Sequence, residues 1–489
     1  MRSRDLPVFP LTPEPVRPGV APSVRAADHH PDPAGPAAGP RIALVTLGCD
    51  KNTVDSERMM AALVGHGARV SGALEGAEVV IVNTCGFIEA AKEQSVETIL
   101  EACALKEEAG VRAVVAVGCM VQRYKDELQA EIPEVDLFMG LTELEGLIPA
   151  LQERDLLPPP DRIPVMERPL RILTTDTPHS SFLKISEGCD HTCAFCAIPL
   201  MRGLHRSQPL ESLVAEARSL GRAGVRELNI ISQDTTWYGR DRRRQDPSAP
   251  LLPDLLRALL AETEVDWFRL FYMYPSGITQ ELVELMGENA ARRTGPRIVP
   301  YLDLPLQHGS DRMLQAMRRP ERRATILERV GWLRDAIPDL TLRTTVILGF
   351  PGETEEDVDE LVALLEEIRF DRVGAFAYSI EEGTRAAEME GHLSESLKQE
   401  RLEAVLDVQR GISLDRNLDL VGTRRPLLVD REVPDDPEYV GVGRTDGQAA
   451  DVDGVTHLLS LEGARIGDLV EVEIVDAMEY DLIGKVVAT

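Results

Sequence analysis

The sequence predicts an α/β protein in three folded parts: an N-terminal parallel α/β domain, a partial (βα)6 barrel and a small C-terminal antiparallel β-barrel. From Arg41 to about Leu151, apolar runs of strand length alternate with helical periodicity, which is the pattern of βαβ units in a parallel sheet. Six further strand-like runs, separated by amphipathic stretches, follow from about Thr175. After Gly422 come five short strands with Gly and Asp turns, which is typical of a closed OB-type barrel.

The first folded part follows a proline-rich tail. Residues 1–40 contain ten prolines and cannot form a packed core, so we expect a disordered segment. The N-terminal domain is expected over 41–151, and a second proline-rich segment, 152–174, reads as a linker. The strand candidates of this domain are 42–48, 79–83 and 114–118.

The partial barrel is expected over 175–412, with ligands at the C-terminal ends of its strands. Its strand candidates are 182–186, 227–232, 268–272, 298–304, 342–349 and 374–379. A long amphipathic helix, about 396–420, leads into the last domain, 413–489. From residue 423 onward there are six Lys or Arg against fifteen Asp or Glu, a net charge of −9. Because a barrel that binds RNA needs a positive groove, we do not expect nucleic-acid binding to dominate.

The bulk composition narrows the cellular setting. No stretch of the 489 residues approaches a membrane span, and the first residues lack the apolar region of a secretory signal, so we expect a cytoplasmic protein. The formal net charge of −29 favours a basic partner over a phosphate backbone, although solubility alone is an equally good reading of that charge.

Three of the seven cysteines lie in one short segment directly after the first barrel strand. Cys189, Cys193 and Cys196, here called the C-terminal triplet, have the spacing C-x3-C-x2-C. Three thiolates can hold three irons of a [4Fe–4S] cluster and leave the fourth iron open. Zinc is the competing interpretation, because His191 or His205 could complete a tetrahedral site.

Three other cysteines are far apart in sequence but share one context. Cys49, Cys85 and Cys119, here called the N-terminal triplet, each follow an apolar strand. The carboxyl ends of parallel strands share one edge, so the three thiols should converge there on a second cluster. The alternative is three buried core cysteines. The seventh cysteine, Cys103, lies on the apolar face of a helical pattern and reads as a core residue.

These segments resemble the radical-SAM methylthiotransferases over about residues 40–485. The C-terminal triplet, CDHTCAFC, is similar to the family's cluster motif. LGCDKNTVDSERM, NTCGFIEAAKEQS and VGCMVQRY are similar to its three N-terminal cluster segments, and the C-terminal barrel is similar to its TRAM domain.

The resemblance implies two [4Fe–4S] clusters and S-adenosylmethionine (SAM) as cofactors, with no catalytic residue beyond the cluster ligands. SAM would bind the open iron at the C-terminal triplet. An external low-potential donor such as flavodoxin or ferredoxin would supply the electron that splits SAM to a radical, which removes a hydrogen from the substrate. Sulfur at the auxiliary cluster of the N-terminal triplet would couple to that carbon. A second SAM would transfer its methyl group to the sulfur.

Within the resembled family, two substrates compete. One branch modifies an adenosine of tRNA, and the other modifies the β-carbon of an aspartate in ribosomal protein S12. SEGCDHTCAFCAIPLMRG, YSIEEGTRA and VGRTDGQAADVDGV are more similar to the S12 branch, and an acidic barrel suits a basic ribosomal protein. A tRNA methylthiotransferase is the alternative, and a non-catalytic iron–sulfur sensor with a TRAM binding module is a distant one.

Three further segments have both a functional and a structural interpretation. Gln233 and Asp234 follow the second barrel strand and could contact SAM or shape a turn. The glycines of 344–354 could admit the nucleoside or simply make a turn. The basic run 240–244 could touch ribosomal RNA, or be a solvated loop.

Overall fold

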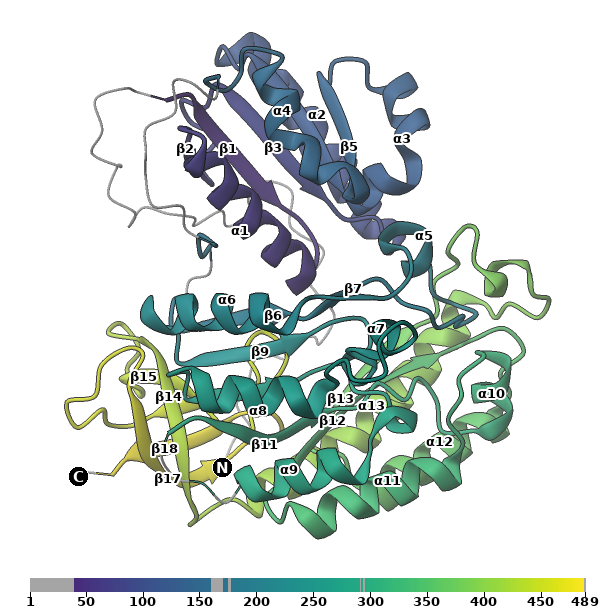
Figure 1. The fold of residues 1–489 in the computed structure, drawn as a ribbon. Helices are drawn as coiled ribbons and strands as arrows, with labels where there is room; N and C mark the ends of the chain where they lie inside the picture. Colours follow the sequence, from purple (N-terminus) through teal and green to yellow (C-terminus); the bar gives the residue numbers. More distant parts are fainter. Residues whose placement is uncertain (1–38, 160–169, 175–176, 291, 293–294, 488–489) are drawn as a thin grey trace.

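The computed structural model describes residues 39–159, 170–174, 177–290, 292 and 295–487. Residues 1–38 of the predicted disordered tail and residues 160–169 of the predicted linker therefore lie outside the described residues. Figure 1 shows the N-terminal domain above a second, larger sheet, with the C-terminal barrel beside the lower part of that sheet.

The N-terminal domain is a five-stranded parallel sheet in the order β2-β1-β3-β4-β5. Its strands are β1 (Arg41–Thr46), β2 (Arg69–Ser71), β3 (Val79–Thr84), β4 (Ala113–Gly118) and β5 (Leu137–Gly140). Its helices are α1 (Asp50–Gly65), α2 (Glu89–Glu108), α3 (Cys119–Glu131), η1 (Leu141–Gly146) and α4 (Leu147–Gln152). Every residue of β3 and β4 is buried, because helices cover both faces of the sheet. Cys103 is partly buried and packs from α2 against one of the two resulting cores, which supports its interpretation as a residue of the core's margin.

The second sheet has six parallel strands in the order β13-β12-β11-β10-β9-β6 and does not close on itself. Its strands are β6 (Ser180–Lys184), β9 (Glu227–Ile231), β10 (Trp267–Leu270), β11 (Arg297–Asp303), β12 (Thr341–Leu348) and β13 (Arg372–Ala377). All six predicted strands are present within two residues of their expected starts, so the structure confirms the partial barrel.

Helices alternate with these strands and cover the outer face of the sheet (Figure 1). The longer ones are α6 (Leu210–Arg222), α8 (Leu252–Glu262), α9 (Gln280–Ala290), α11 (Arg323–Ala336), α12 (Glu355–Ile368) and α13 (Glu395–Leu418). Short elements at the carboxyl ends of the strands are β7 (Ser186–Glu187), α5 (Ile198–Arg202), β8 (Arg206–Ser207), η3 (Thr235–Trp237), α7 (Arg240–Arg243), η4 (Pro275–Gly277), α10 (Asp311–Ala316) and η5 (Arg385–Glu388). None of the described helices is both long and apolar enough to cross a membrane.

The C-terminal domain is a closed five-stranded barrel in the order β14-β15-β16-β18-β17. Its strands are β14 (Arg424–Glu432), β15 (Gly441–Thr445), β16 (Thr456–Leu458), β17 (Leu469–Ala477) and β18 (Leu482–Val486). Four of the five pairings are antiparallel, as expected, and β16 with β18 is parallel. Closure leaves this small sheet without an open edge.

All three parts meet on the inner face of the open sheet. One buried apolar cluster joins Val54 of α1, Val299 and Tyr301 of β11, and Leu428 of β14. Part of the face that a full barrel would enclose is therefore covered by the other two domains.

A buried ion network fixes the C-terminal barrel to the sheet. Arg444 Nη1 lies 2.6 Å from Glu227 Oε2, and Arg269 Nη2 lies 2.8 Å from Glu227 Oε1. Arg444 also pairs with Asp430 of its own barrel at 2.8 Å, and Asp430 contacts His179 at 2.9 Å. Burial alone would raise the pKa of Glu227, but Arg444 and Arg269 outweigh it and hold that pKa at about 2.

Candidate functional site

The N-terminal triplet lies at one edge of the first sheet. Cys49 precedes α1, Cys85 directly follows β3, and Cys119 opens α3 directly after β4. The three strands are neighbours and parallel, so their carboxyl ends meet. Burial raises the pKa of Cys119 to about 12 against the opposing charge of Arg202, and Cys49 and Cys85 add to the increase. The three cysteines thus follow three neighbouring strands at one edge of the sheet.

Two glycines allow this close approach. Gly48 has φ +94°, and a Cβ there would lie 2.9 Å from the Cys85 sulfur. Gly118 has φ +102° and ψ −158°, a region that only glycine occupies readily, and a Cβ there would lie 2.4 Å from Asn83 Oδ1. The Gly-Cys pairs at the carboxyl ends of β1 and β4 therefore have a geometric cause.

The C-terminal triplet occupies the loop after β6 and β7. The Cys189 N–H donates to the Gly203 carbonyl at 3.0 Å, and the Cys196 N–H donates to the Cys193 carbonyl at 3.2 Å. Burial raises the pKa of both Cys189 and Cys196 to about 12, with the neighbouring thiols adding to the increase. Such thiols ionise when a metal binds them, because the metal replaces the proton.

Each triplet offers three thiols, which is the donor set of a [4Fe–4S] cluster with one open iron and one ligand short of a structural zinc site. Among the residues that the structure describes, no three His, Cys, Asp or Glu side chains stand close enough to share one metal ion. One zinc ion holds four ligands at about 2.0–2.3 Å, whereas a [4Fe–4S] cluster takes one thiolate per iron and keeps them further apart. His191 Nε2 is instead 2.7 Å from Asp234, and His205 Nε2 is 3.2 Å from Ser207 Oγ, so both candidate fourth ligands have other partners.

The two triplets are brought together by packing between the domains. Cys119 lies in one buried cluster with Ala197 and Met201, and Ala197 is the residue that follows Cys196. The helix α5, which carries Met201, packs on α3, which begins at Cys119. The edge of the first sheet therefore faces the C-terminal triplet's loop.

Two tyrosines that follow β10 connect the same regions. The Tyr272 hydroxyl donates to Asp50 Oδ2 at 3.2 Å, and Lys51 Nζ lies 3.2 Å from the centre of the Tyr272 ring. Two residues further on, the Tyr274 hydroxyl lies 3.9 Å from Cys193 Sγ. Sequence reasoning missed both residues, and the available signal was a Tyr-x-Tyr pattern at a predicted strand end.

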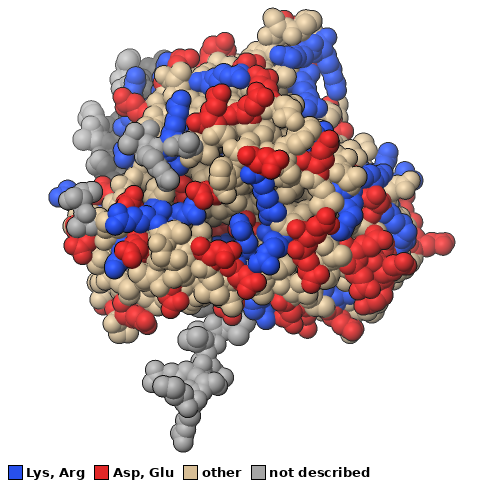
Figure 2. All heavy atoms as spheres, turned by 90° about the horizontal axis from the view of Figure 1, so that it is seen from below, with Lys and Arg blue, Asp and Glu red and all other residues tan. Residues whose placement is uncertain are grey.

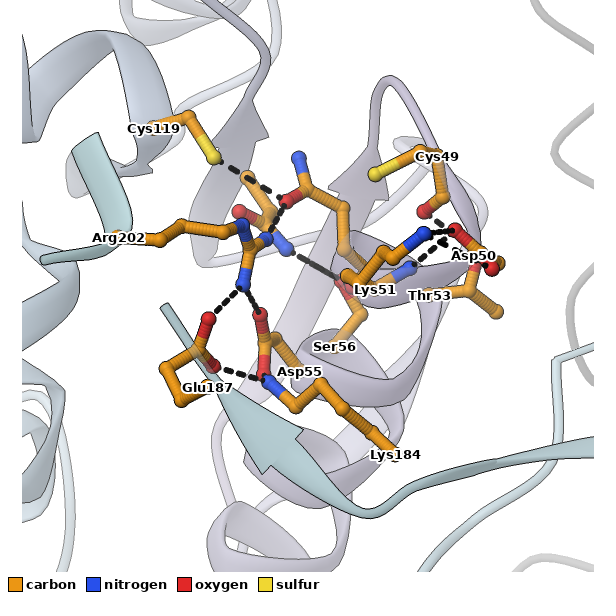
Figure 3. Close-up of polar contacts among 12 residues, drawn as sticks. Cys49, Asp50, Lys51, Thr53, Asp55, Ser56, Cys119, Lys184, Glu187 and Arg202 are labelled. Atoms are coloured by element: carbon orange, nitrogen blue, oxygen red, sulfur yellow. Dashed lines mark hydrogen bonds and ion pairs between the residues drawn. The ribbon is translucent and has the colours of Figure 1, made fainter. Parts of the chain in front are cut away.

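Arg202 is a third residue that sequence reasoning missed, and Figure 3 shows its surroundings. Its Nη2 donates to Asn52 Oδ1 at 2.6 Å, and the Cys119 thiol donates to the same oxygen at 3.5 Å. On the opposite side, Nη1 contacts Asp55 at 3.2 Å and Glu187 at 2.8 Å. These contacts join α1 to α5 and β7 beside the N-terminal triplet.

Asp234 and Gln233, the two predicted SAM contacts, differ in whether their side chains already have hydrogen-bond partners. Asp234 is buried, and its carboxylate accepts from the Thr236 N–H at 2.9 Å, from the Thr236 hydroxyl and from His191. Those contacts support the turn-forming interpretation of Asp234, and a SAM contact of Asp234 stays a prediction. The Gln233 side chain is half-buried and has no hydrogen-bond partner among the described residues, so a SAM contact of Gln233 stays a prediction.

Two other segments make contacts that support their structural interpretation, while their functional interpretations stay predictions. A Cβ on Gly349 would lie 2.4 Å from Lys398 Cγ, so this glycine permits close packing of α13. In the basic run, Arg242 donates to the Ser207 carbonyl, Arg243 to Ala249, and Arg244 pairs with Asp190 at 3.3 Å. Arg242 and Arg243 thus hold local structure, whereas the Arg244 side chain is mostly exposed.

Comparisons with known proteins agree with this geometry. Uncharacterized protein family UPF0004 matches residues 41–140, the radical SAM superfamily matches 183–365, and the TRAM domain matches 421–487. The fold is similar to that of TsrM, a radical SAM methyltransferase from Kitasatospora setae, with a TM-score of 0.50, 14% identity and coverage of 76% of this chain and 89% of that one. The fold and the cysteine loop define a radical SAM enzyme.

The particular family follows from closer relatives. The ribosomal protein uS12 methylthiotransferase RimO of Geobacter sulfurreducens is 41% identical over 453 residues, which cover 92% of this chain and 99% of that protein. The proteins of the same name from Symbiobacterium thermophilum and Bdellovibrio bacteriovorus are 44% and 42% identical over 91% and 92% of the chain, and over 90% and 98% of their own lengths. The chain belongs to the RimO family of SAM-dependent methylthiotransferases.

Proposed function

We propose that this protein adds a methylthio group to the β-carbon of an aspartate in ribosomal protein uS12. The observation that carries the proposal is similarity of about 40% identity to uS12 methylthiotransferases over nearly the whole length of both chains. The convergence of two cysteine triplets from two domains supports it, because insertion of sulfur into a C–H bond needs both radical generation and a sulfur source nearby.

The cofactors assigned to the triplets are two [4Fe–4S] clusters and SAM, which when bound supply C–H activation and the sulfur. Cys189, Cys193 and Cys196 would hold the cluster that binds SAM, and the N-terminal triplet would hold the auxiliary cluster. Ala197 and Met201 pack on Cys119 in one buried apolar cluster, so they would give the auxiliary cluster an apolar boundary on that side. Tyr274 stacks on His191 with ring centroids 4.3 Å apart, which keeps the loop of the C-terminal triplet in place.

The substrate and the electron source are assigned from chemistry. The C-terminal barrel carries a net charge of −9 from residue 423 onward, which favours a basic ribosomal protein over tRNA. On the face in Figure 2, Lys and Arg side chains are scattered among acidic ones rather than gathered in one field. A soluble low-potential carrier such as flavodoxin or ferredoxin would supply the electron.

Mass spectrometry of both candidate substrates tests this proposal. The anaerobically reconstituted chain is incubated with SAM, a reductant and either uS12 or tRNA, and each product is analysed. We expect a gain of CH2S on one aspartate of uS12 and no change in tRNA. A methylthio group on tRNA with unmodified uS12 would contradict the substrate assignment.

Cysteine variants test the separate roles of the triplets. Iron analysis should give about eight irons per chain, and about four when Cys189, Cys193 and Cys196 are all replaced by Ala. That triple variant should form no deoxyadenosine from SAM. Replacing Cys49, Cys85 and Cys119 should leave deoxyadenosine formation intact but abolish methylthiolation. If the second triple variant still methylthiolates uS12, the auxiliary role is wrong.

A further inference from the structure

Each cysteine triplet has one buried arginine beside it. Arg202 is 3% exposed and Arg319 is 2% exposed. The two arginines come from different segments: Arg202 ends α5, and Arg319 follows α10. Neither belongs to the cysteine motifs themselves, and long charged side chains are rarely buried unless they are paired.

Arg202 presents a positive charge to the N-terminal triplet and is neutralised on its far side. Its Nη2 shares Asn52 Oδ1 with the Cys119 thiol, while its Nη1 faces Asp55 and Glu187 (Figure 3). Lys184 also pairs with Glu187 at 2.6 Å and with Asp55. The four side chains carry two positive and two negative charges, and Arg202 is the one that shares a hydrogen-bond acceptor with the Cys119 thiol.

Arg319 stands in the same relation to the C-terminal triplet. Its Nη1 lies 3.8 Å from Cys193 Sγ, and its Nη2 donates to the Pro305 carbonyl at 2.8 Å. Its guanidinium lies 3.9 Å from the centre of the Tyr274 ring, and its Nε is 3.2 Å from Glu321. The carboxylate is again on the side of the guanidinium away from the sulfur contact.

We propose that Arg202 and Arg319 are positioning residues that tune the reduction potentials of the two clusters separately, each acting on the cluster beside it. This inference rests on the proposed function, because it assumes that both triplets hold clusters. Reduction adds one negative charge to a cluster, so a buried cation stabilises the reduced form and raises the potential. Nearby charge and hydrogen bonds to sulfur are known determinants of cluster potential.

Separate tuning has a chemical purpose in a two-cluster enzyme. The cluster that activates SAM must be reducible by an external donor, and the auxiliary cluster must not capture that electron unproductively. Both ligand sets are three thiolates. A separate cation beside each cluster allows each reduction potential to be set independently, by the position and the charged partners of its own arginine. The low local dielectric of a buried site strengthens the effect of each charge.

A redox titration of the full-length, reconstituted protein followed by electron paramagnetic resonance tests the inference. The two alanine triple variants first assign each signal to its triplet. We expect Arg202→Gln to shift only the N-terminal triplet's cluster to lower potential, and Arg319→Gln to shift only the other cluster. Arg372→Gln, a buried arginine that contacts Asn417 rather than a cysteine, should shift neither potential.

A second variant separates electrostatics from misfolding. Arg202→Gln leaves the network with a net negative charge, whereas the double change Arg202→Gln with Glu187→Gln restores neutrality. The reduction potential of the N-terminal triplet's cluster in the double variant should therefore lie closer to the native value than in Arg202→Gln. Unchanged potentials in both single variants, a joint shift of both clusters in either one, or no recovery in the double variant would overturn the inference. The titration needs no uS12, so a failed substrate assignment leaves its result readable.

Discussion

At the scale of single residues, the site depends on backbone geometry next to the cysteines as much as on the cysteines. Gly118 places Cys119 at the start of α3 by adopting a conformation closed to other residues. The adjacent Asn83 is fully buried, and its amide donates to Ser56 Oγ at 3.0 Å and to the Asn52 carbonyl. A side chain at 118 would displace this hydrogen-bonded group, which lies just before Cys85.

Gly118→Ala should therefore damage both stability and the auxiliary cluster. We expect a loss of about 1–3 kcal/mol in the free energy of unfolding from backbone strain, and iron content falling toward about four per chain. Gly110→Ala is the matched control, because Gly110 also has positive φ but a Cβ there meets nothing within 4 Å. The control should lose about 1 kcal/mol and keep its iron. Denaturant titration with iron analysis distinguishes the two, and equal iron content would contradict the argument.

At the scale of elements, the sequence predicts the central strands of the two parallel sheets because runs such as β3, β4 and β9 are mostly apolar and buried on both faces. The edge strands β2 and β5 are missing from the prediction, since three residues (RVS) and four residues (LFMG) give no periodic signal. Convergence of the N-terminal triplet follows from strand topology alone. The contacts of Tyr272, Tyr274 and Arg202 do not, because they arise where separately folded elements pack together.

The ion network around Glu227 joins the C-terminal barrel to the open sheet, and we expect its loss to lower the free energy of unfolding strongly. Arg444→Met would leave the Glu227 carboxylate buried with one of its two cations removed, which costs about 3–5 kcal/mol in the free energy of unfolding. Arg424→Met, in the same barrel, removes an exposed pair with Glu471 and should cost less than about 1 kcal/mol. Thermal or urea unfolding measures both, and similar losses would show that the buried pair contributes no more than the exposed one.

The same carboxylate predicts a pH dependence. The folded-state pKa of Glu227 is depressed to about 2 from an ordinary value of 4.5, so its contribution to stability is fully present above about pH 4.5. That contribution is lost as pH falls from about 4.5 toward 2. Unfolding free energies measured across this window should fall less steeply for Glu227→Gln than for the native protein, after correction for its lower stability. If the stability of Glu227→Gln and of the native protein fell with the same slope, the pKa of Glu227 would not be lowered in the folded state.

At the scale of the whole molecule, the three parts form one unit around the open sheet. The C-terminal barrel packs on the inner face of the open sheet through Leu428 and is held there by the ion pair of Arg444 with Glu227. It is therefore a fixed part of the folded unit rather than a domain on a flexible linker. Its remaining outer surface carries exposed acidic residues, including Asp435 and Glu438 in the turn between β14 and β15. A fixed acidic surface can orient a basic partner relative to the cysteine triplets.

Reversing charge on this surface should therefore weaken the capture of uS12. We expect Asp435→Lys with Glu438→Lys to raise the Kd for uS12 several-fold at low salt, and the difference to shrink as salt is added, because exposed charges are screened beyond about 10 Å at 0.1 M. Glu107→Lys with Glu108→Lys changes the net charge equally at the end of α2, on the N-terminal domain, and should have a smaller effect. Binding measured across a salt series separates the cases. Equal effects of the two double substitutions would mean that only the net charge attracts uS12. If neither changed the Kd, exposed charges on these two surfaces would not contribute to binding.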